Sequence, residues 1–93
     1  MSMSVVFERL FKNRTVFVTG HTGFIGSWLA QWLCDLGANV VGYSLEPPTR
    51  PSLFETIGLE KRLEHIIGDI NDHAKLQKSI QENSPEFVFH LAA

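Results

Sequence analysis

The spacing of hydrophobic positions changes repeatedly along this chain, and each change predicts a different element. Four short runs rich in β-branched and aromatic residues are typical of buried strands. After the first run, apolar residues recur every three or four positions, which is the period of an amphipathic helix. This helix is predicted to begin after Gly23 and to end before Gly37, because glycine commonly terminates helices. The four predicted strands are residues 15–19, 40–44, 65–69 and 86–92.

The remaining segments divide into helices and one loop. Three prolines within five residues exclude both a helix and a strand at residues 46–51. Asp72 is placed to cap the helix that follows it, and Pro85 ends that helix. The predicted helices are residues 5–11, a segment at 52–63 that Gly58 interrupts, and residues 73–83.

Strands therefore alternate with helices in the order β-α-β-α-β-α-β, after a short N-terminal helix. This alternation predicts an α/β fold, in which a parallel sheet is built through right-handed crossovers. No internal repeat, linker or low-complexity tract is visible in the sequence.

Composition narrows the class of protein. Hydrophobic residues make up 44% and charged residues 19% of the 93 positions, which is typical of one small folded domain. The net charge is −2 without a Lys/Arg cluster, so a nucleic-acid-binding role is not expected. Neither a signal peptide nor a membrane span is expected from residues 1–93. Cys34 is the single cysteine, which favours a reduced, cytoplasmic protein without disulfides.

The stretch Thr-Gly-His-Thr-Gly-Phe-Ile-Gly-Ser at residues 19–27 joins the first strand to the first long helix. Gly20 permits a tight turn, Gly23 allows the backbone to approach a ligand, and Gly26 allows close packing of the helix on the sheet. The helix N-terminus that follows suits a pyrophosphate. A phosphate-binding P-loop is excluded because Gly26 is followed by serine and tryptophan, without the lysine that the motif requires.

The spacing Gly-x-x-Gly-x-x-Gly resembles the extended branch of the short-chain dehydrogenase/reductase superfamily, whose members act on nucleotide sugars. Two more segments match that branch: Gly-Asp-Ile at residues 68–70 and His-Leu-Ala-Ala at residues 90–93. The loop Gly-Tyr-Ser-Leu-Glu-Pro-Pro-Thr at residues 42–49, with Pro-Ser-Leu-Phe at residues 51–54, is similar to the family of CDP-glucose 4,6-dehydratases.

The resemblance implies the N-terminal half of a Rossmann-like doubly wound parallel sheet, with the strand order 3-2-1-4 that topology rules also favour. It also implies NAD as the cofactor, held at three places. The residues implied are Gly20, Thr22, Gly23, Phe24, Ile25 and Gly26 at the pyrophosphate, Asp69 and Ile70 at the adenine, and Leu91, Ala92 and Ala93 near the ribose.

Ser44 occupies the end of the second strand, where many NAD-binding proteins place a carboxylate that accepts hydrogen bonds from the ribose hydroxyls. A serine can make one hydrogen bond there but does not repel a 2′-phosphate. Arg50, in the following loop, could attract such a phosphate. The resemblance implies NAD, with Ser44 at the ribose. Ser44 and Arg50 themselves leave NADP open as the cofactor.

For the whole enzyme, the resemblance implies a lyase that converts CDP-glucose to CDP-4-keto-6-deoxyglucose with an internal NAD hydride cycle, acting as a homodimer. Its catalytic residues are expected beyond residue 93, so residues 1–93 are expected to be the N-terminal part of a longer enzyme and inactive alone. Three alternatives remain: a GDP-mannose 4,6-dehydratase that uses NADP, a nucleotide-sugar epimerase, and a non-catalytic dinucleotide-binding module.

The four histidines show no spacing typical of metal ligands, and no cysteine pair accompanies them, so no metal site is expected. His21 lies in the glycine loop, either beside the cofactor or filling space. His90 is predicted to be a buried, hydrogen-bonded residue of the fourth strand. Trp28 and Trp32, four apart on one helix face, are predicted to pack in the core or against the sheet.

Overall fold

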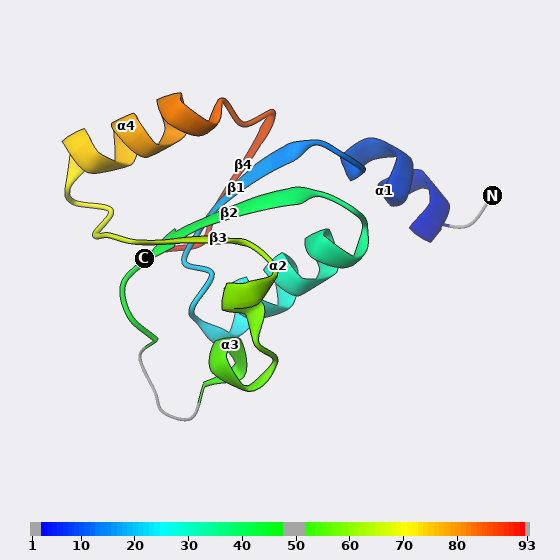
Figure 1. The fold of residues 1–93 in the computed structure, drawn as a ribbon, viewed down its shortest axis with the longest axis horizontal. Helices are drawn as coiled ribbons and strands as arrows, with labels where there is room; N and C mark the ends of the chain where they lie inside the picture. Colours follow the sequence, from blue (N-terminus) through cyan, green and yellow to red (C-terminus); the bar gives the residue numbers. More distant parts are fainter. Residues whose placement is uncertain (1–2, 48–51, 93) are drawn as a thin grey trace.

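The computed structural model describes residues 3–47 and 52–92, and its centre is a four-stranded sheet (Figure 1). Neighbouring strands are parallel, and their order is β3-β2-β1-β4. The predicted α/β class and strand order are therefore confirmed. The strands are β1 (Thr15–Thr19), β2 (Asn39–Ser44), β3 (Glu64–Ile67) and β4 (Phe87–His90).

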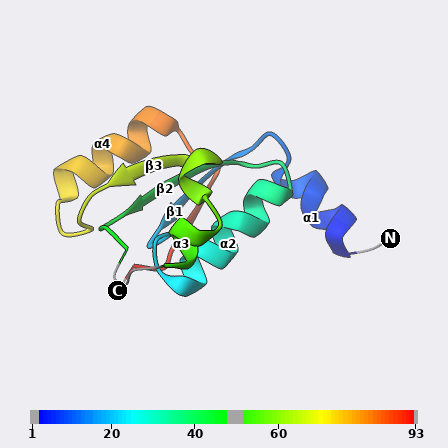
Figure 2. The same ribbon diagram turned by 60° about the horizontal axis from the view of Figure 1, so that its bottom comes forward.

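Helices cover both faces of the sheet (Figure 2). One face carries α4, and the other carries α2 and α3, while α1 packs at the end of the α2 layer. Asp72 caps α4 as predicted, because its carboxylate accepts a hydrogen bond from the backbone N–H of Lys75. The helices are α1 (Met3–Phe11), α2 (Phe24–Asp35), α3 (Leu53–Thr56), the 3₁₀ helix η1 (Leu59–Lys61) and α4 (His73–Asn83).

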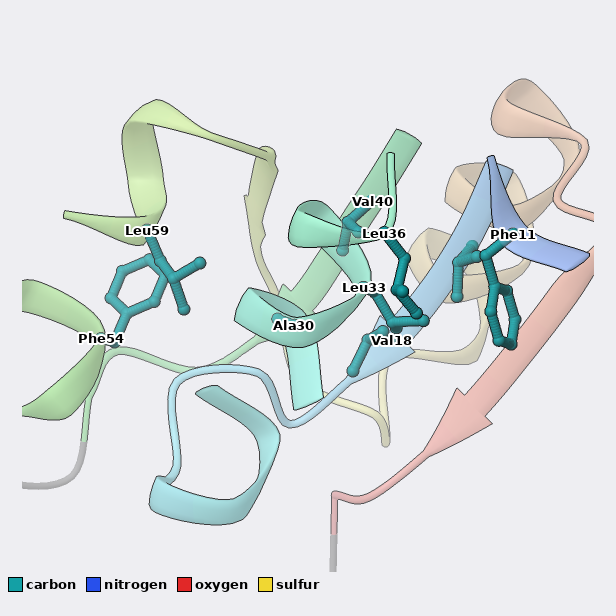
Figure 3. Packing of buried hydrophobic residues seen from close by; sticks show 9 residues of the cluster. Phe11, Val18, Ala30, Leu33, Leu36, Val40, Phe54 and Leu59 are labelled. Atoms are coloured by element: carbon teal, nitrogen blue, oxygen red, sulfur yellow. The ribbon is translucent and has the colours of Figure 1, made fainter. Parts of the chain in front are cut away.

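Burial on both faces explains the continuous apolar runs of the central strands. Successive side chains of a strand point to opposite faces, so Val18 joins the cluster under α2 whereas Phe17 joins the cluster under α4. Figure 3 shows Val18 and Val40 of the sheet beside Leu33 and Ala30 of α2. The sheet is thus held between two hydrophobic layers, which fixes the positions of the loops at its ends.

The prediction for the two tryptophans is wrong in this structure. The exposed fractions of Trp28 and Trp32 are 54% and 42%. The residues of α2 that are buried are Gly26, Ser27, Ala30 and Leu33, three of which are small. Small side chains let the axis of α2 come close to β1. The face of α2 that is buried is therefore the one with small side chains, and the face with the tryptophans is exposed.

The prediction that His90 is buried is also wrong, although its predicted hydrogen bond is present. His90 ends β4, the edge strand of the described sheet, and its side chain is exposed. Its Nδ1 lies 2.7 Å from Oγ1 of Thr19 on the neighbouring strand β1. Val88, two residues earlier and on the same face of β4, is exposed as well, so the described helices do not cover this face of the strand.

The proline loop predicted at residues 46–51 lies partly outside the described residues, since 48–51 are not among them. Across the described ranges, 3–47 and 52–92, none of the helices has both the length and the apolar character to cross a membrane.

Candidate functional site

A cavity of about 500 Å³ opens at the carboxyl ends of the strands, a volume in the range of small-molecule sites. The chain leaves β1 toward β2 on one side, while β4 lies on the other side of β1, so the cavity adjoins the point where the strand order reverses. Ligands of open α/β sheets bind at such a point. The predicted site residues that line the cavity are Gly20, Thr22, Gly23, Ser44, Asp69, Ile70, Leu91 and Ala92.

Gly20 brings three strand ends together. Its φ is +84°, a left-handed conformation that glycine adopts without strain. Its N–H donates to the carbonyl of Tyr43, and a Cβ here would lie 2.8 Å from the backbone nitrogen of Ala92. The predicted tight turn is therefore present, and it also makes room for the segment that follows β4.

Gly23 and Gly26 differ in what surrounds them. A Cβ on Gly26 would overlap the carbonyl group of Gly20, so this position needs glycine because of the loop itself. The sequence-based prediction that Gly26 serves packing of the helix on the sheet is therefore wrong about the reason. A Cβ on Gly23 would meet the carbonyl oxygen of Gly20 at 3.6 Å, an ordinary contact. The fold therefore tolerates a side chain at Gly23, and the space beside it opens to the cavity.

The N-terminus of α2 supplies backbone donors beside the cavity. Gly23 is its N-cap and makes no side-chain capping bond, and the first N–H groups of any α-helix lack partners within the helix. The side chains of Phe24 and Ile25 are exposed, and neither residue lines the cavity, nor does Gly26. The contact of these three residues with a pyrophosphate stays a prediction.

The end of β2 carries two linked hydroxyl groups. Oγ of Ser44 lies 2.8 Å from Oγ1 of Thr22, and Thr22 donates to the carbonyl of Leu45 over 3.0 Å. Both hydroxyl-bearing residues are buried and line the cavity together with Glu46. The sequence identified Ser44 and Thr22 as site residues but did not indicate their contact. Arg50 and Ala93 lie outside the described residues.

The end of β3 is shaped by Tyr43. A Cβ on Gly68 would overlap the Tyr43 ring, and the Tyr43 hydroxyl donates to the carbonyl of Asp69 over 2.9 Å. The Asp69 carboxylate accepts from the N–H of Asn71, so it stabilises a turn. Asp69 also lines the cavity, and its contact with an adenine stays a prediction.

His21 belongs to the glycine loop but does not line the cavity. Its ring is fully buried, packs over Gly42, where a Cβ would overlap it, and meets Phe54 edge-on at 5.3 Å between centroids. Its Nε2 lies 2.7 Å from Nδ1 of His65 on β3. Burial and, to a smaller extent, the nearby His65 lower the pKa of His21 to about 3, so its imidazole is neutral.

Of the two interpretations of His21, the structure thus favours the space-filling one. The contact with His65 was not predictable from spacing, since the two are 44 positions apart. Within residues 3–47 and 52–92, no three His, Cys, Asp or Glu side chains are grouped in a way that could hold a metal ion.

Comparisons with known proteins point to one family. Residues 17–93 match the family model described as GDP-mannose 4,6 dehydratase. The CDP-glucose 4,6-dehydratase of Salmonella typhimurium is 55% identical, over 92% of this chain and 24% of the Salmonella protein. Among solved structures, the epimerase Mth375 of Methanothermobacter thermautotrophicus has a TM-score of 0.78 and 34% identity, covering 99% of this chain and 26% of its own.

The Bordetella bronchiseptica enzyme WbmH, solved with NAD+, has a TM-score of 0.71 and 33% identity, covering 87% of this chain and 26% of its own. This chain spans about a quarter of the length of these relatives. The fold is Rossmann-like, and the resemblance inferred from the glycine motif is confirmed at the level of the family. The chain belongs to the GDP-mannose 4,6-dehydratase family.

Proposed function

We propose that this chain is the N-terminal, NAD-binding part of a nucleotide-sugar 4,6-dehydratase that converts CDP-glucose to CDP-4-keto-6-deoxyglucose. The observation that carries the proposal is the 55% identity, over 92% of the chain, to an enzyme named CDP-glucose 4,6-dehydratase. Because the chain spans 24% of that enzyme, the proposal assigns cofactor binding to residues 1–93 and catalytic residues to the remainder of a longer protein.

The described residues fit a dinucleotide. The cavity lies at the strand-order reversal, Gly23 leaves the backbone open to a ligand, and the start of α2 supplies donors for a pyrophosphate. When bound, NAD supplies a hydride acceptor that is regenerated within each turnover. In the proposal, the pyrophosphate is held by Gly20, Thr22, Gly23, Phe24, Ile25 and Gly26, the adenine by Asp69 and Ile70, and the ribose by Ser44, Leu91, Ala92 and Ala93.

The proposal also places the full enzyme in the cytoplasm as a homodimer whose small-molecule partner is the nucleotide sugar. Cys34, half-buried on α2, is the single cysteine of residues 1–93, so this part of the proposed enzyme contains no internal disulfide, which fits a reduced compartment. Nucleic acid and membrane surfaces are not proposed as partners, in keeping with the net charge of −2.

The test uses the longest native polypeptide that contains these residues. The purified protein is incubated with NAD and CDP-glucose, with UDP-glucose or GDP-mannose in parallel, and followed by proton NMR. A new C6 methyl signal from CDP-glucose alone is expected. A methyl signal from another sugar nucleotide would overturn the substrate, and NAD binding without any methyl signal would favour an epimerase or a non-catalytic module.

A further inference from the structure

The two hydroxyl groups at the end of β2 form a chain of hydrogen bonds whose direction is determined. Thr22 Oγ1 lies 3.0 Å from the carbonyl oxygen of Leu45. A carbonyl oxygen can only accept, so the single hydroxyl hydrogen of Thr22 is directed to Leu45. The second bond of Thr22, 2.8 Å to Ser44 Oγ, must then take its hydrogen from Ser44.

Ser44 has no further hydrogen to donate, because a serine hydroxyl carries one. What its oxygen can still offer is a lone pair, so at this position the side chain acts as an acceptor. Thr22 and Ser44 are both buried, which limits the exchange of their mutual bond for bonds to water. A neutral serine thereby presents the same hydrogen-bonding character as the carboxylate that commonly ends this strand in NAD-binding folds.

We propose that Thr22 fixes Ser44 as a hydrogen-bond acceptor and that this pair makes the site select NAD over NADP. The inference rests on the proposed function, since it concerns the same dinucleotide. A ribose 2′-hydroxyl can donate to Ser44, whereas a 2′-phosphate offers mainly acceptor oxygens and a negative charge. Glu46 lines the same cavity, and none of the described lining residues is a lysine or arginine.

The experiment measures the dissociation constants of NADH and NADPH by fluorescence titration of the longest native polypeptide. The wild type is expected to bind NADH at least about tenfold more tightly. Thr22→Val removes the oxygen that accepts the Ser44 hydrogen, so the Ser44 hydroxyl becomes able to donate to a phosphate. The NADPH-to-NADH ratio of dissociation constants is expected to fall by about tenfold in this variant, the size of one charge-assisted hydrogen bond.

A double-mutant cycle separates this mechanism from a change of shape. In the Ser44→Ala background no hydroxyl is left to redirect, so adding Thr22→Val is expected to change the ratio by less than about twofold. An equal effect of Thr22→Val with and without Ser44 would overturn the inference. A wild type that binds NADPH as tightly as NADH would overturn it even if the variants fail to fold. A wild type that binds neither would instead overturn the proposed function.

Discussion

Acidification is expected to destabilise the fold through His21, a residue outside the cavity. The pKa of its imidazole is lowered from an ordinary 6.5 to about 3, first by burial and second by the neighbouring His65. The unfolded chain takes up a proton on this imidazole as the pH falls below 6.5, whereas the folded chain does not. The stability that His21 contributes is therefore complete above pH 6.5 and is lost as the pH falls toward 3.

The size of the effect follows from the same two pKa values. At about pH 5 the unfolded chain holds the His21 proton almost fully, and at about pH 7 it holds little of it. Protonation of the unfolded state across that interval is worth about 2 kcal/mol. This amount is a substantial fraction of the free energy of unfolding of a small domain.

The assay is urea unfolding of the chain at both pH values, with His21→Phe as the test variant. Phenylalanine keeps a ring over Gly42 and against Phe54 but has nothing to protonate. His73→Gln is the matched control, because His73 is an exposed histidine at the start of α4. The loss of unfolding free energy between the two pH values should shrink by about 2 kcal/mol in His21→Phe and not in His73→Gln. Parallel losses in the wild type and His21→Phe would refute the reasoning.

The glycine loop and the cap of α4 give further predictions. Gly26→Ala should lower the free energy of unfolding by about 2 kcal/mol, because its Cβ overlaps the backbone of Gly20. Gly23→Ala should change the free energy of unfolding by less than about 1 kcal/mol yet weaken NADH binding at least tenfold. Thermal melts and NADH titration check both glycine variants. A Gly23→Ala variant that loses stability but binds NADH normally would contradict the role of Gly23 in ligand binding. Asp72→Ala should cost about 1 kcal/mol in urea unfolding, since the N–H of Lys75 loses its cap, and an unchanged midpoint would show that the cap contributes nothing.

The strands and helices were predictable from the sequence because the sheet is buried on both faces. Its central strands are then continuous apolar runs, and Gly37 marks a helix end in the local sequence. The inward face of α2 was not predictable in the same way, because Trp28 is more hydrophobic than Ser27 and yet Ser27 is the buried one. Hydrophobicity ranks side chains by transfer from water, whereas close approach of a helix to a strand selects them by size.

Within the candidate site, the predictable part is the part fixed by local backbone geometry. Gly20 needs a positive φ and Gly26 needs the absence of a Cβ. The glycine spacing predicted that both positions need glycine, although it attributed Gly26 to packing of the helix on the sheet rather than to contact with the loop. The contacts of His21 with His65 and of Thr22 with Ser44 depend on strand register. The first pair is separated by 44 positions in the sequence and the second pair by 22. Spacing along one sequence carries no information about such pairs.

The contact between Thr22 and Ser44 also changes the cofactor preference that is inferred from Ser44. In the sequence, Ser44 stands where a carboxylate is expected, which by itself indicates a weaker preference for NAD over NADP. In the structure its hydrogen is directed to Thr22, whose own hydrogen is directed to Leu45, so its oxygen still accepts, as a carboxylate would. What Ser44 lacks is the charge, and a neutral acceptor makes a hydrogen bond about half as strong as an ionised one. The preference for NAD should therefore have the same sign as with an aspartate at this position, but be smaller.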